Sequence, residues 1–87
     1  MTRENLKKKI DEIIIEELDL NKNFFKDKTD IIMSDIIKEP LMAYQVLAQI
    51  ESKLDILIDD TPMHTKELSY EDFIDIFYNE YLREKGE

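Results

Sequence analysis

The sequence contains no cysteine and only one glycine, and each shortage removes a class of chemistry. Without cysteine there are no disulfide bonds, thiolate metal ligands or cysteine nucleophiles, so packing alone must stabilise the fold. The single glycine is Gly86, far from any strand-to-helix pattern. A glycine-rich loop that wraps a phosphate is therefore absent, and the sequence gives no indication of nucleotide chemistry.

Long apolar runs are also missing. No stretch approaches the roughly 18 residues that span a bilayer, and the first residues lack the apolar core and cleavage site of a signal peptide. We therefore expect a cytoplasmic protein without a membrane span.

The charge is strongly of one sign. Against 12 basic residues there are 21 acidic ones, which gives a formal net charge of −9 at pH 7 and argues against nucleic acid as a partner. The length of 87 residues corresponds to one small domain, and 43% hydrophobic residues is too large a share for charge-driven disorder. We expect a single helical domain over residues 1–87.

Apolar residues recur at helical spacing in three segments. The pattern predicts helices near 3–18, 40–53 and 69–83, with a short helical turn in 59–67. Pro40 suits the first position of its helix, where the missing N–H has no intrahelical partner. Ser69 suits the N-cap of the last helix, with Asp72 three residues later in a capping-box-like pair. The predicted fold class is all-α.

Two segments between these helices are less regular. The apolar patch 31–37 fits either a buried strand or a helical turn, and periodicity leaves both open. Residues 21–30 are polar and predict a loop, with Phe24 and Phe25 tucked onto the core. The positions expected to be buried are Leu6, Ile10, Ile14, Leu41, Leu47, Ile50, Leu54, Phe73, Ile74 and Phe77.

Two motifs flank the second long helix. It opens with Glu39-Pro40-Leu41, and Leu54-Asp55-Ile56-Leu57-Ile58-Asp59-Asp60 follows it. Their order and spacing resemble the acyl carrier protein family, in which Asp-Ser-Leu opens the second helix and an Asp-Ile-x-Ile segment follows at the same distance. The resemblance extends over nearly the whole chain. It implies an acyl-carrier-protein-like four-helix bundle.

The chain departs from that family at the attachment residue. The family's serine carries phosphopantetheine through a phosphodiester, whereas Pro40 has no hydroxyl. Glu39 and Leu41 keep the acidic and leucine neighbours of the motif. The resemblance thus implies a carrier-shaped protein that is not an enzyme, with no cofactor and no catalytic or metal-binding residues. A true carrier modified at another hydroxyl, such as Ser34, is an alternative, although that register makes the following helix too long.

The second helix also suggests how a partner binds. Between Leu41 and Leu54 its single acidic residue is Glu51. We expect a neutral strip to bind a protein partner by apolar burial, with little dependence on salt. The strip consists of Met42, Gln45, Val46 and Gln49. Within that family, the chain most resembles the acyl-carrier-related proteins of bacterial peptide maturation clusters. This narrower resemblance implies a biosynthetic or peptide-modifying enzyme as the partner. We expect the protein itself to be a monomer.

A calcium-responsive helical protein is the other alternative, because residues 19–30 resemble an EF-hand loop. Five polar residues occupy ligand positions of that loop: Asp19, Asn21, Asn23, Asp27 and Asp30. However, Phe24 stands where the loop requires glycine, and Lys26 stands where an apolar residue packs. A solvated interhelical loop is the favoured interpretation.

The remaining chemistry-bearing residues predict no active site. His64 is the only histidine and has no nucleophile or second histidine beside it. The acidic pairs 16–17 and 59–60 are expected on a solvated face, since catalytic carboxylates need a concave pocket. The tyrosines Tyr44, Tyr70, Tyr78 and Tyr81 are expected to be half-buried core residues.

Overall fold

Helices make up most of the structure. The computed structural model describes residues 1–26, 30–56 and 68–85. These residues form α1 (Arg3–Leu18), α2 (Met33–Ile36), α3 (Pro40–Leu54) and α4 (Tyr70–Lys85), and no β-strand occurs among them. The predicted all-α class is confirmed, whereas the turn predicted in 59–67 lies outside the described residues.

The helix boundaries follow the predicted caps closely. α1 spans the predicted 3–18, and Thr2 caps it by accepting a 3.2 Å hydrogen bond from the Asn5 N–H. α3 starts at Pro40 as predicted and continues one residue further than predicted. α4 starts one residue later than predicted, because Ser69 serves as its cap, with Oγ 3.0 Å from the Asp72 nitrogen. The capping interpretation of Ser69 is therefore correct.

The apolar patch 31–37 combines the two structures that the sequence left open. Its centre is the single helical turn α2. Just before α2, Ile32 forms an isolated antiparallel bridge with Ser69. Two backbone hydrogen bonds of 2.8 Å secure this bridge, from the Met33 N–H to the Leu68 carbonyl and from the Tyr70 N–H to the Ile31 carbonyl. The bridge holds α2 against the start of α4.

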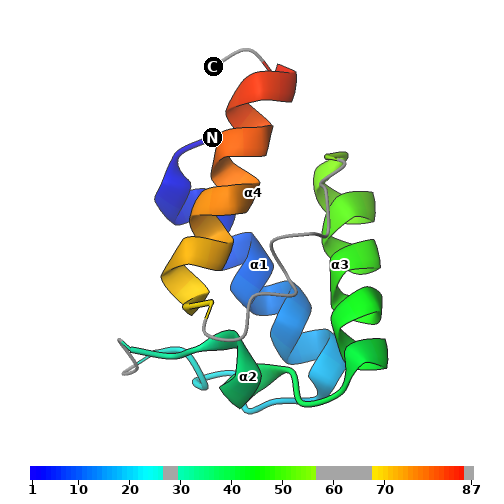
Figure 1. The fold of residues 1–87 in the computed structure, drawn as a ribbon. Helices are drawn as coiled ribbons and strands as arrows, with labels where there is room; N and C mark the ends of the chain where they lie inside the picture. The colour runs from blue at the N-terminus through cyan, green and yellow to red at the C-terminus, as the bar shows by residue number, and fades with distance from the viewer. Residues whose placement is uncertain (27–29, 57–67, 86–87) are drawn as a thin grey trace.

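Helix α1 is central to the arrangement (Figure 1), since both α3 and α4 pack against it. In Figure 1, α3 stands to one side of the pair formed by α1 and α4, and α2 lies at the end where α3 begins. One hydrophobic cluster joins all four helices and the loop after α1. Its buried members are Leu6, Ile10, Ile13, Ile14, Phe25, Ile31, Met33, Ile36, Val46, Leu47, Ile50, Tyr70, Phe73, Ile74 and Phe77.

Eight of the ten predicted core positions are buried, and two differ. Leu41 is 65% exposed, so its predicted burial is wrong. Leu54, in the last turn of α3, packs against the core but is only partly buried. Phe25 is buried and Phe24 packs on the core, as predicted for the loop after α1.

Tyr70 joins three parts of the molecule. Its side chain is 3% exposed and stacks on Phe25, with 4.6 Å between the ring centroids. Its hydroxyl donates a hydrogen bond to the Asp11 carboxylate, whose other oxygen lies 3.2 Å from the Lys7 ammonium. Lys7 in turn lies 5.4 Å from the centroid of the Tyr70 ring, within the range of a cation–π contact. Burial and the bond to Asp11 raise the pKa of Tyr70.

We predict that Tyr70→Phe lowers the free energy of unfolding by about 1–2 kcal/mol at pH 7, because it removes the hydrogen bond from the buried Tyr70 hydroxyl to the part-buried Asp11 carboxylate. Urea unfolding measures this difference. Since the folded pKa of Tyr70 lies above the unfolded value of about 10, the wild-type advantage is present below pH 10 and shrinks as pH rises further. Tyr44→Phe, at an exposed hydroxyl, is the matched control and changes stability by less than about 0.5 kcal/mol. Equal effects of the two variants would contradict this role of Tyr70.

Candidate functional site: the outward face of α3

Helix α3 carries the position at which the motif resemblance expects chemistry. Its N-cap, Glu39, has extended backbone geometry, and its side chain makes no capping hydrogen bond. Pro40 follows as the first helical residue. At the other end, Asp55 adopts a left-handed conformation with φ of 55°, and its backbone N–H bonds to the Glu51 carbonyl. These caps leave a helix of 15 residues with two distinct faces.

The inner face of α3 consists of apolar residues at helical spacing. Val46 and Ile50 are 0% exposed and Leu47 is 5% exposed. All three belong to the core cluster that α1 and α4 also line. This face fixes the rotation of α3 on the molecule, and thereby decides which residues point away.

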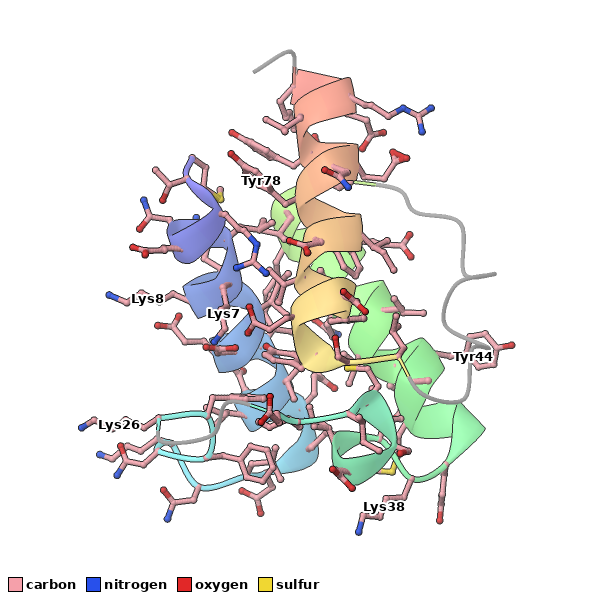
Figure 2. The ribbon with its side chains drawn as sticks, turned by 60° about the vertical axis from the view of Figure 1, so that its left-hand side comes forward. Lys7, Lys8, Lys26, Lys38, Tyr44 and Tyr78 are labelled. Carbon is pink, nitrogen blue, oxygen red and sulfur yellow. The ribbon has the colours of Figure 1, made fainter. Side chains whose placement is uncertain are left out.

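The outer face carries two large apolar side chains. Leu41 is 65% exposed and Tyr44 is 52% exposed. Figure 2 shows Tyr44 projecting from α3 away from α1 and α4. At 3.6 residues per turn, five exposed residues fall within an arc of about 100°. We call them the α3 outer strip: Leu41, Tyr44, Gln45, Ala48 and Ser52.

The structure corrects the predicted docking strip. Val46 is fully buried, so its assignment to an exposed surface is wrong. Gln45 is exposed as expected, whereas Met42 and Gln49 are half-buried along one flank of the outer strip. The predicted core combined Leu41 and Tyr44 with Leu47, which lie on different faces of the helix.

The spacing of small and branched residues could have separated these faces. Ala43, Val46, Leu47, Ile50 and Leu54 follow the i, i+3, i+4, i+7, i+11 pattern of one buried stripe. Placing this stripe inward puts Leu41 and Tyr44 outward without any further information. The missed signal was Ala43, a small residue that is half-buried at the edge of this stripe.

The α3 outer strip carries no charge, in contrast to the rest of the described surface. Most of the exposed carboxylates in the described ranges lie on α1 and α4: Glu4, Glu12, Glu16, Glu17, Glu71, Asp72, Asp75 and Glu84. On α3, Glu51 is half-buried beside the strip, next to Tyr44, and Lys53 is exposed further around the helix. The Lys53 ammonium lies 3.8 Å from a Glu16 oxygen, an exposed pair that contributes little stability.

The attachment position offers no nucleophile. Proline at position 40 has no hydroxyl, and its neighbours Lys38 and Glu39 are both exposed. Ser34, the alternative hydroxyl, is exposed on α2 and precedes α3 by six residues. The resemblance expects a phosphodiester on a hydroxyl at the start of α3, and residues 38–41 have no hydroxyl.

The EF-hand-like loop is organised by its own side chains. Asp19 ends α1 in a left-handed conformation, with φ of 52°. The Asn21 side-chain oxygen accepts a 2.8 Å hydrogen bond from the Asn23 N–H, which closes a local turn. Phe24, at the position that requires glycine in an EF-hand, packs against the core. Asp27 lies outside the described residues, and within the described ranges no three acidic, histidine or cysteine side chains converge to hold a metal ion.

The remaining candidates from the sequence are the acidic pairs, the histidine and the tyrosines. Glu16 and Glu17 are exposed on α1. His64 and the acidic pair 59–60 lie outside the described residues. Of the four tyrosines, Tyr78 and Tyr81 are half-buried as expected, whereas Tyr70 is fully buried and Tyr44 is exposed, both contrary to the expectation.

Comparison with known proteins leaves the family open. No family model matches the chain, and no curated protein or solved structure shows significant similarity to it. The acyl-carrier resemblance therefore depends on the motifs and their spacing. Among the described helices, none is both long and apolar enough to cross a bilayer.

We predict opposite outcomes for glutamate at two apolar positions of α3. Val46→Glu places an unpaired carboxylate in the core and lowers the free energy of unfolding by about 3 kcal/mol or more. Leu41→Glu, on the outer strip in the first turn, changes it by less than about 1 kcal/mol, since a carboxylate there interacts favourably with the helix dipole. Thermal unfolding followed by circular dichroism distinguishes the two variants. A folded Val46→Glu protein with wild-type stability would contradict the assigned rotation of α3.

Proposed function

We propose that this protein is an acyl-carrier-like helical bundle without a prosthetic group, which acts as a non-covalent interaction module. The observation that carries the proposal is the start of α3. There Pro40, which the resemblance matches to the family's serine, is the first residue of the helix, and Leu41 and Tyr44 are exposed after it. In this proposal, the start of α3 has no residue that could carry a prosthetic group, and its exposed apolar side chains serve to bind a partner.

The order of the elements supports this proposal. The three long helices α1, α3 and α4 follow one another in the order that the family resemblance implies, whereas the short turn expected in 59–67 lies outside the described residues. The Asp55 position, which matches the family's motif after its second helix, is the left-handed C-cap of α3. The motif residues therefore occur at the two caps of the same helix, as the resemblance requires.

The docking surface in this proposal is the α3 outer strip rather than the strip predicted from sequence. Tyrosine and leucine on a neutral helix face contribute to binding mainly by burial of apolar area. Because the strip carries no charge, association along it depends little on salt at the contact itself. The partner is a protein, and the family resemblance favours a biosynthetic or peptide-modifying enzyme of bacterial peptide maturation.

The test is the intact mass of the protein after co-expression with a promiscuous phosphopantetheinyl transferase. We predict no phosphopantetheine increment on the wild type, since Pro40 offers no oxygen nucleophile. Pro40→Ser restores a hydroxyl at the start of α3 and is expected to gain the increment. Pro40→Ala, which removes the proline without adding a hydroxyl, is the matched control and remains unmodified.

An increment on the wild-type protein would overturn the proposal. Peptide mapping would then locate the modified residue, and modification of Ser34 would identify the protein as a covalent carrier with a shifted attachment site. Calcium-dependent shifts at Asp19 and Asn21 in an NMR titration at micromolar calcium would instead support the calcium-responsive alternative.

A further inference from the structure

We draw no further inference here: the strongest candidate, the apolar outer face of α3 at Leu41 and Tyr44, belongs to the site already described, and nothing in the structure shows what covers it.

Discussion

The buried phenol of Tyr70 imposes the constraint on which the arrangement of this chain depends. A phenolic hydroxyl removed from water must find a partner, and Asp11 on α1 is the acceptor that the structure provides. The ring of Tyr70 simultaneously packs on Phe25, and its backbone N–H bonds to Ile31. One residue therefore aligns the first turn of α4 with α1, with the loop after α1 and with the approach to α2. Lys7 neutralises the carboxylate that makes this possible.

With α1 and α4 joined in this way, α3 takes a peripheral place. It packs on α1 through one apolar face, and its opposite face has no described helix to cover it. In a carrier the start of this helix would bear a prosthetic group, whereas here it bears proline followed by exposed leucine and tyrosine. The proposed partner binding uses this face, which presents Leu41 and Tyr44 and has no hydroxyl at position 40.

Local signals in the sequence predicted the helices well and their rotation less well. Thr2, Pro40 and Ser69 mark helix starts by their own chemistry, so the boundaries of α1, α3 and α4 could be placed within two residues. Rotation about a helix axis depends on which of two overlapping apolar stripes contacts the core. α3 has apolar residues on both faces, and the stripe chosen from sequence exchanged Val46 with Leu41. The Tyr70–Asp11 bond joins residues 59 positions apart, and no local pattern indicates it.

The most direct test of this account is amide hydrogen exchange, measured residue by residue in the wild type and in Tyr70→Phe. If Tyr70 joins α1 to α4, core amides such as those of Ile14 and Ile74 exchange only through global unfolding, and their protection falls equally in the variant. Because α3 packs through one face, we expect it to open locally. The amides of Val46 and Ile50 should then exchange at a lower opening free energy than the amides of Ile14 and Ile74. This local opening free energy should be the same in the wild type and in Tyr70→Phe. Highest protection in α3, or loss of protection in Tyr70→Phe confined to residues beside the substitution, would contradict the central place given to Tyr70.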